Sequence, residues 1–321
     1  MYLINYPHPS QHAVAYAQNG SIDDNEGKCI CFVTVSPRLR RELHGRYNNI
    51  ERLEKVALPT IKFYSLRELL GDLLSFTKLG IDESESCTFI EYVNIQEKKS
   101  HASIAVDTKE TESKSSCIFY DCTYKCLTLS LFLDETGGVI LGSLDAAISG
   151  RALTREEYVV SVRSYIEKDT DAGKQKRHEI YDWYEKYARW KQLNGRFDIN
   201  DIVIKLINEL KQVQPENIGN GTKKGGWVQL FNAAYLDEIQ DFSYASIYLI
   251  CNIAGTPNLR WIFAGDTAQM ISPGCSFKFQ GLKEVLLAVQ PGIESKIKHV
   301  DKLEKNYRVT KDVLNVSNVR K

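Results

Sequence analysis

The sequence lacks any long hydrophobic run. No stretch approaches the roughly 18 apolar residues that a membrane-spanning helix needs. Its first residues, MYLINYPHPSQH, also lack the basic segment and long apolar core of a secretory signal. The sequence therefore predicts a protein with no membrane segment that works inside the cell, in the nucleus or the cytoplasm.

The chain also lacks net charge. Lysine and arginine total 41 of its 321 residues, and aspartate and glutamate total 41 as well. No overall basic field indicates nucleic acid, so any such contact needs a local groove. The C-x2-C pairs of a zinc knuckle are missing too. The eight cysteines are scattered, and Cys117, Cys122 and Cys126 lack the paired spacing and the fourth ligand of a zinc knuckle, so reduced thiols are favoured.

Two apolar runs of strand length, each ending on acid, dominate the second half of the sequence. WVQLFNAAYLDEIQDF ends its apolar part at Asp237 and Glu238, and LRWIFAGDTAQMI ends at Gly265 and Asp266. Buried parallel strands have this pattern, and ligands bind at the carboxyl ends of such strands in open α/β sheets. Two acidic strand ends joined by one helix predict a phosphate and metal site.

The first half opens with strand and helix signals. KCICFVTV predicts a central strand, and the following Ser36 and Pro37 predict a helix start. IKFY predicts a second strand, followed by a helix that Ser65 caps. Two interpretations stay open for the basic residues of the first helix, a solvated face or phosphate contacts to a nucleic-acid strand. These residues are Arg38, Arg40, Arg41 and Arg46.

The middle of the chain has a different character. Residues 81–130 show short β-like pieces and no helical period. A capping box from Thr154 to Glu157 then predicts a helix through residue 166, and EIYDWYEKYARWKQL predicts another that ends at the Asn194-Gly195 stop signal. We interpret the aromatic stripe of the second helix as core, with base stacking as the alternative. RFDINDIVIKLINELKQV predicts a further amphipathic helix.

Four short motifs follow one another in a recognisable order. They are TVSPRLR, DEIQD, GDTAQ and LEKNYR. The series resembles the superfamily 1 helicases of the UvrD/Rep type. It is most similar to the UvrD-like helicase regions of large eukaryotic proteins of the TPR and ankyrin repeat-containing type, which share GDTAQ followed by a segment such as GCSFKF. The resemblance covers most of the chain, strongly at Cys29–Tyr47 and Phe197–Asn318.

The resemblance implies ATP and Mg²⁺ as cofactors. Asp237 matches the carboxylate that holds Mg²⁺, usually through water, and Glu238 matches the one that orients or deprotonates the attacking water. Gln240 and Asp241 match positions that couple the nucleotide site to the nucleic-acid site. The remaining matches are Asp266, which shapes its loop, Gln269, which senses the γ-phosphate, Arg308, which reaches that phosphate from a second motor domain, and Tyr307, which lies near the adenine.

Single-stranded DNA or RNA is the partner that the resemblance implies. Matches to strand-gripping positions are Thr34, Ser36 and Arg38 in one motif and Phe63, Tyr64 and Ser65 in the next. Phe277 and Phe279 stand where the family places aromatics that stack on bases. Because ISPGCS inserts extra residues before them, plain packing is the alternative for both rings.

One family element is absent from the sequence. No G-x-x-x-x-G-K-[ST] loop occurs, so the amides and lysine that would hold the β- and γ-phosphates are not supplied, and the sequence ends soon after NYR. We expect an α/β fold, an incomplete RecA-like P-loop NTPase parallel sheet domain with a mixed, mainly helical insertion. The expected parts are residues 1–80 and 196–300 for the motor domain, 81–195 for the insertion and 301–321 for the start of a second motor domain.

Two functions stay open at this point. One is an ATP-dependent helicase or translocase, present here as a fragment whose missing parts belong to a longer parent protein. The other is a catalytically inactive helicase-like fragment that binds nucleic acid or serves a structural role. In both cases we expect the isolated chain to show weak ATPase activity or none.

Overall fold

A parallel sheet forms the centre of the molecule. The computed structural model describes residues 29–54, 60–77, 79, 86–88, 91–92, 94–95, 129–212, 222–224, 226–255, 261–265 and 277–293. Four strands pair in the order β2-β1-β5-β6, and all three pairings are parallel. The strands are β1 (Cys29–Thr34), β2 (Thr60–Ser65), β5 (Ala233–Asp237) and β6 (Trp261–Phe263). The expected α/β architecture with a parallel sheet is confirmed.

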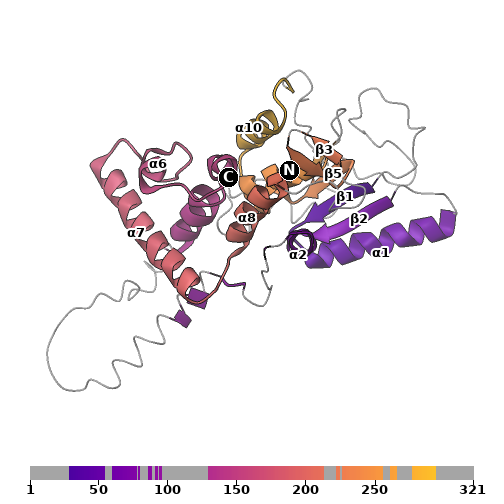
Figure 1. The fold of residues 1–321 in the computed structure, drawn as a ribbon, viewed down its shortest axis with the longest axis horizontal. Coiled ribbons are helices and arrows are strands. Elements are labelled where there is room, and N and C mark those ends of the chain that lie inside the picture. The colour runs from indigo at the N-terminus through magenta and orange to yellow at the C-terminus, as the bar shows by residue number, and fades with distance from the viewer. Residues whose placement is uncertain are drawn as a thin grey trace, which may run out of the picture.

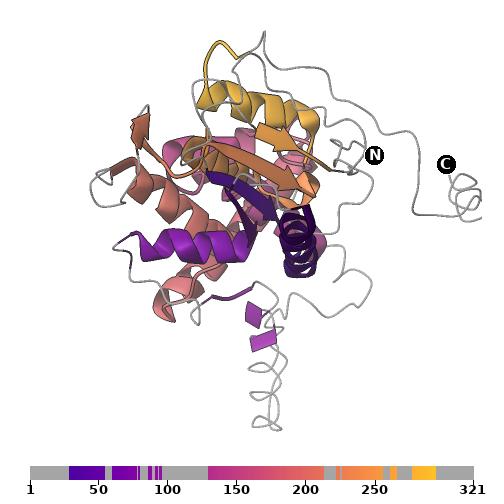
Figure 2. The same ribbon diagram turned by 90° about the vertical axis from the view of Figure 1, so that its right-hand side faces the viewer.

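Helices flank both sides of this sheet (Figure 2). Successive side chains of β1 point to opposite faces. Phe32 contacts Phe63 on the face that α1 (Pro37–Glu54) covers, whereas Cys31 and Val33 enter the main core. That core includes the buried sides of α2 (Leu66–Ser75), α8 (Ile199–Gln212), α9 (Tyr244–Ile253) and α10 (Phe279–Val289).

The first two helices begin where the sequence predicts. The Ser36 hydroxyl oxygen accepts a hydrogen bond from the Leu39 amide at 3.2 Å, with Pro37 at the first helical position. Ser65 caps α2 in a reciprocal capping box with Glu68. These local signals place both helix starts at the carboxyl edge of the sheet.

The approach to β5 differs from the expectation of one strand running from Trp227. The structure has a separate hairpin of β3 (Thr222–Lys224) and β4 (Trp227–Gln229) before it. Gly226 takes a left-handed conformation with φ of 85°, which glycine adopts at little cost. The amides of Leu230 and Phe231 then bond the Ile253 carbonyl, and this turn separates β4 from β5.

A helical unit lies to one side of the sheet, at the left of Figure 1. It contains the π-helix η2 (Asp134–Ile140), α5 (Leu144–Ser149), α6 (Arg155–Val160) and α7 (Asp171–Leu193). The predicted extension of α6 to residue 166 is wrong. Arg177, which is buried, donates hydrogen bonds to the carbonyls of Val159, Ser161 and Ile166 and thereby holds the chain in a loop.

Glu135 closes the same loop from the other side. Its carboxylate accepts hydrogen bonds from the Tyr158 hydroxyl at 2.9 Å, the Ser164 hydroxyl at 2.9 Å and the Tyr165 amide at 2.7 Å. Burial raises the pKa of Glu135 above its usual value, although these donors and Arg177 oppose the increase. The buried acid therefore has a full set of partners.

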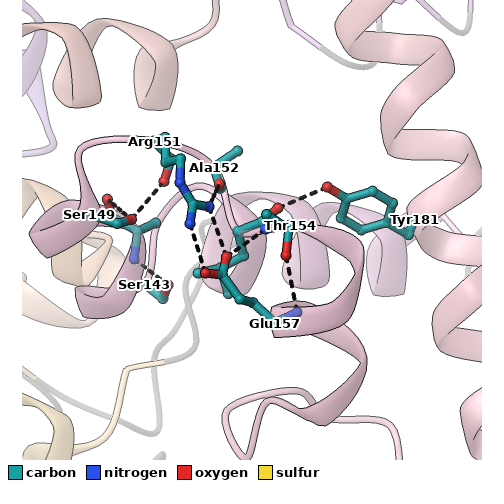
Figure 3. Close-up of polar contacts among 9 residues, drawn as sticks. Ser143, Ser149, Arg151, Ala152, Thr154, Glu157 and Tyr181 are labelled. Carbon is teal, nitrogen blue, oxygen red and sulfur yellow. Dashed lines mark hydrogen bonds and ion pairs between the residues drawn. The ribbon is translucent and has the colours of Figure 1, made fainter.

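Figure 3 shows the predicted capping box at the start of α6. Glu157 accepts a hydrogen bond from the Thr154 amide at 2.7 Å, and the guanidinium of Arg151 binds both Glu157 oxygens at 2.7 and 2.8 Å. The Arg151 hydrogen bond, followed by the bond from Thr154, lowers the pKa of Glu157 to about 2. The Tyr181 hydroxyl joins α7 to this turn by donating to the Leu153 carbonyl at 2.9 Å.

The aromatic stripe of α7 is core, as predicted. Its buried residues include Ile180, Tyr181, Tyr184, Tyr187 and Lys191. The helix ends at Leu193, and Gly195 has φ of 59°, so the predicted stop signal is confirmed.

One seam between the helical unit and the rest of the chain lies just before α8. Ser86 and Phe197 form a parallel bridge, and the Cys87 amide donates to the Phe197 carbonyl at 2.7 Å. Next to it, the Lys191 ammonium binds carboxylate oxygens of Asp198 at 2.6 Å and Asp201 at 2.5 Å. The two ends of the expected insertion thus meet, while the division into domains stays a prediction.

Two expected absences concern the part of the chain that the structure describes. None of its helices is long and apolar enough to cross a membrane. Its cysteines, Cys29, Cys31, Cys87 and Cys251, are free thiols. The cluster Cys117, Cys122 and Cys126 lies outside the described residues.

Candidate nucleotide and nucleic-acid site

Three predicted site residues form one row across the carboxyl edge of the sheet. Thr34 of β1 is in register with Ser65 of β2 on one side and with Asp237 of β5 on the other. All three side chains are buried. Because the strands are parallel, the segments that follow them leave the sheet at the same edge.

The turn after Asp237 has an unusual conformation. Glu238 has φ of 55° and ψ of 44°, and among the described residues it is the one non-glycine residue with positive φ. A side chain in this left-handed region costs on the order of 1–2 kcal/mol. The turn η4 (Ile239–Asp241) follows at once. Such local strain is typical of functional sites, where the surrounding structure holds it.

Gln240 holds the Glu238 carboxylate. Its side chain is 1% exposed, and its Nε2 donates to Glu238 Oε2 at 2.6 Å. One oxygen of the half-buried Glu238 is therefore held in place. This arrangement suits a carboxylate that must orient a water molecule.

The two acidic motifs meet at Gly265. The Ile239 amide donates to the Ala264 carbonyl at 2.9 Å, which ties the turn after β5 to the end of β6. A Cβ atom at Gly265 would lie 2.5 Å from Gln240 Oε1 and 2.7 Å from Ile239 Cγ2. Glycine is therefore required for this close approach, and the DEIQD and GDTAQ motifs share one corner of the sheet.

Four of the predicted nucleotide-site residues cannot be placed. Asp266, Gln269, Tyr307 and Arg308 lie outside the described residues. Their roles stay predictions.

The predicted strand-gripping hydroxyls take part in local hydrogen bonds. Thr34 Oγ1 accepts from the Ser36 amide at 3.3 Å, and Ser36 Oγ caps α1. Ser65 Oγ donates to Glu68 Oε2 at 2.8 Å and accepts from the Glu68 amide. Arg38, by contrast, is exposed. These hydroxyls shape the edge, and the arginine extends from it.

The two aromatic residues of β2 pack on opposite faces. Phe63 lies between His44 and Tyr47 of α1, with both ring centroids 5.4 Å away. Tyr64 meets Phe231 edge to face at 6.2 Å. Burial, together with a hydrogen bond to Asp72, raises the pKa of Tyr64. Both rings are half-buried, so a part of each remains accessible to a ligand.

Phe277 and Phe279 surround the first turn of α10. Phe277 is 3% exposed and stacks on Tyr244 at 6.1 Å, while Phe279 is half-buried and meets Phe277 edge to face at 5.1 Å. In this conformation Phe277 fits the packing alternative, and Phe279 has surface left for a base. Base stacking by either ring stays a prediction.

The sequence did not single out Tyr244 of α9, which binds the start of α10. Its hydroxyl donates to the Lys278 carbonyl at 3.1 Å and accepts from the Lys278 amide at 2.7 Å. A Cβ atom at Gly281 would lie 2.3 Å from the Tyr244 ring. Because every residue of α9 is buried, no amphipathic pattern could distinguish Tyr244 from its neighbours.

A comparison with protein families agrees with the order of the motifs. Residues 20–279 match the family model of the UvrD/REP helicase N-terminal domain. The chain belongs to this family. The UvrD/REP match spans all four strands of the sheet, the helical unit, and both Phe277 and Phe279.

A curated relative shares part of this UvrD/REP region. TPR and ankyrin repeat-containing protein 1 of Homo sapiens is 29% identical over 152 residues. The alignment covers 45% of this chain and 5% of the human protein, so the chain spans a small part of that relative.

Helicases of the UvrD/REP family use ATP and Mg²⁺ in general, and the donor set at this corner fits the metal. Mg²⁺ usually binds one or two carboxylates together with water and substrate phosphates. Asp237 and Glu238 supply two adjacent carboxylates at a strand end. No larger group of three or more metal-binding side chains occurs in the described ranges. A cation held here would have Asp237 as its protein ligand and would neutralise phosphate charge.

Proposed function

We propose that this chain forms the core of a UvrD-like ATP-dependent helicase or translocase that moves on single-stranded DNA or RNA. The observation that carries the proposal is the register of Thr34 with both Ser65 and Asp237. It sets the segments matched to strand binding beside the acids matched to ATP hydrolysis. A motor needs such proximity, because hydrolysis must change the grip on the strand.

Each acid has a distinct part in this proposal. Asp237 binds Mg²⁺ through water, and Glu238 orients or deprotonates the water that attacks the γ-phosphate. Gln240 fixes Glu238 by its hydrogen bond of 2.6 Å and passes changes at the nucleotide to the nearby strand-binding segments. Gln269 and Arg308 sense the γ-phosphate, and Tyr307 contacts the adenine.

On the other half of the edge, the proposal assigns strand contacts to the motif residues. These are Thr34, Ser36, Arg38, Phe63, Tyr64, Ser65, Phe277 and Phe279. Stacking and phosphate contacts tolerate any sequence, which a translocating motor requires. ATP hydrolysis would open and close two motor domains along the strand, with the NYR segment at the start of the second.

A catalytically inactive module is the second candidate. It is favoured by the sequence, which contains no glycine-lysine loop to bind the β- and γ-phosphates. We therefore expect residues 1–321 alone to bind nucleic acid and to hydrolyse ATP weakly or not at all. A longer parent protein would supply the missing phosphate site.

Two measurements on the purified chain test these alternatives. Fluorescence anisotropy with labelled oligothymidine and oligouridine tests the nucleic-acid partner, and binding that weakens with salt is expected. Release of phosphate from Mg²⁺-ATP tests the activity, with and without the oligonucleotide. Absence of binding to both oligonucleotides would contradict the proposed function in either form.

The variant Glu238→Gln distinguishes the motor from the inactive module. It replaces one carboxylate oxygen by an amide and keeps the size of the side chain. Hydrolysis that nucleic acid stimulates and that Glu238→Gln abolishes would show an active motor in these 321 residues and overturn our expectation of weak activity. Background hydrolysis that the variant leaves unchanged would support the inactive module for this isolated chain.

A further inference from the structure

The arginines at the start of α1 are not equivalent in the structure. Arg40 is engaged, because its Nε donates to the Phe63 carbonyl at 3.0 Å and lies 3.2 Å from Glu68 Oε2. Arg46 is engaged with Glu42 at 2.6 Å. Arg38 and Arg41 are exposed and form no ion pair with the described residues.

Arg40 also shows that the first turns of α1 and α2 are neighbours. Its guanidinium, from α1, contacts Phe63 in β2 and Glu68 in the first turn of α2. The register of Thr34 with Ser65 brings the two helix starts to adjacent strands. The second residue of α2 is Arg67, which is exposed and likewise has no ion pair within the described ranges.

The acids beside these arginines have other partners. Glu68 accepts hydrogen bonds from the Ser65 amide at 2.7 Å and hydroxyl at 2.8 Å, in addition to its contact with Arg40. Burial raises the pKa of Glu68, but the Ser65 bonds and the charges of Arg40 and Arg41 outweigh it, so the net pKa is lowered. Arg41 follows Arg40 directly in α1. The local balance of charge is therefore positive on a chain whose total charge is zero.

We propose that Arg67 contacts the phosphate backbone of the single strand and forms one basic surface with Arg38 and Arg41. No motif match assigns Arg67, and the inference rests on the proposed function. Arg40 is a positioning residue that joins α1 to α2 beneath this surface. Three exposed guanidiniums from two adjacent helix starts can bind successive phosphates without reading bases.

This proposal assigns strand binding to the guanidiniums, whereas the motif match assigned it mainly to hydroxyl and aromatic side chains. The hydroxyls of Thr34, Ser36 and Ser65 are used in turns and caps, as described above. The affinity for the strand then comes chiefly from the guanidiniums, and the salt dependence of binding reports them. Each phosphate contact on a single strand contributes a slope of about 0.7 in the logarithmic plot of affinity against salt.

The test is a salt titration of oligonucleotide binding by the full 321-residue chain. Arg67→Gln should weaken binding several-fold at low salt and lower the slope by about 0.7. Arg67→Lys should keep most of the slope, because it keeps the charge. Arg38→Gln with Arg41→Gln should lower the slope about twice as much as Arg67→Gln. Arg46→Gln is the matched control on α1, whose guanidinium is exposed but paired with Glu42, and it should change little.

Each outcome decides the matter. Thermal melts of the variants should lie close to wild type, since the three guanidiniums form no hydrogen bond or ion pair with the described residues, whereas Arg40→Gln should lower the melting temperature. If wild type binds and Arg67→Gln binds with the same affinity and slope, the role of Arg67 is refuted and the proposed function stands. If wild type binds neither oligothymidine nor oligouridine, both fail.

Discussion

The sheet and the helical unit differ in the burial and pairing of their charged side chains. In the helical unit, charges are buried in complete sets of partners: Glu135 has three donors, Arg177 binds several carbonyls, and Lys191 binds two aspartates. At the carboxyl edge of the sheet, Arg38, Arg41 and Arg67 point outward without acidic partners among the described residues, and Glu238 is held in a strained turn. Buried charges with full partners specify structure, whereas outward or strained ones are the candidates for binding and chemistry.

The largest expected effect breaks a closed set of charges. Lys191→Met would leave Asp198 and Asp201, whose side chains are 14% and 21% exposed, without their cation. Burial beside a second carboxylate already raises the pKa of Asp201 despite the nearby ammonium. We expect the free energy of unfolding to fall by about 3–5 kcal/mol, measured by urea denaturation. Lys174→Met, on the same helix but half-exposed and 4.0 Å from Asp171, should cost less than about 1 kcal/mol. A small loss in Lys191→Met would mean that the seam is hydrated.

The next effect tests the contact between the two acidic motifs. Gly265→Ala places a Cβ against Gln240 and Ile239, and we expect a loss of about 1–3 kcal/mol in urea denaturation. Gly45→Ala is the matched control, because a Cβ at Gly45 in α1 meets nothing within 4 Å. It should stabilise the chain by about 0.5–1 kcal/mol, since alanine favours a helix. Equal effects of the two changes would show that the corner is loosely packed.

A smaller effect tests whether the left-handed turn at Glu238 is strained, as a functional site would be. Glu238→Gly and Glu238→Ala both remove the carboxylate, but only glycine accepts φ of 55° without cost. We expect the glycine variant to be more stable than the alanine variant by about 1 kcal/mol in thermal or urea unfolding. If the Glu238→Ala variant is as stable as Glu238→Gly, the turn is not strained, and its conformation no longer indicates a functional site.

The smallest effect comes from an exposed pair of the helical unit. The pKa of Glu157, lowered to about 2 by Arg151 and Thr154, means that its stabilisation is complete above its ordinary value of 4.5 and is lost as the pH falls toward 2. Glu157→Gln should therefore cost less than about 1 kcal/mol at neutral pH, and the difference should shrink in acid. Urea denaturation at several pH values, with the double variant Arg151→Met and Glu157→Gln, isolates the pair.

Much of the fold followed from local patterns in the sequence. The strands ending at Thr34 and Asp237, the caps at Ser36 and Ser65, and the stop after Leu193 all depend on neighbouring residues, so the sequence contains their signal. Sequence motifs also suggested that Asp237 and Glu238 belong with the segment at Gly265. The close approach of Gly265 to Gln240 agrees with this.

What the sequence could not predict depends on contacts between distant segments. The helix from Arg155 ends at Val160 because Arg177 and Glu135 bind the next residues, and neither partner is near in sequence. The sequence could not show that Arg40 forms an ion pair while Arg38 and Arg41 are exposed, because this depends on where Glu68 of α2 lies. The left-handed turn at Glu238 has no compositional signal, since glycine or asparagine is expected there.

The bridge between Ser86 and Phe197 has a consequence for how such a protein can change over time. Chain that leaves and returns at hydrogen-bonded neighbours can be lengthened, shortened or exchanged with little effect on the frame around it. The cost of such a change lies elsewhere, because α5 packs against α8 and α9 in the same core as the sheet, and Arg163 binds Glu284 of α10 at 2.7 Å. Any exchanged segment would have to keep these contacts for the acids and arginines of the sheet to stay in register.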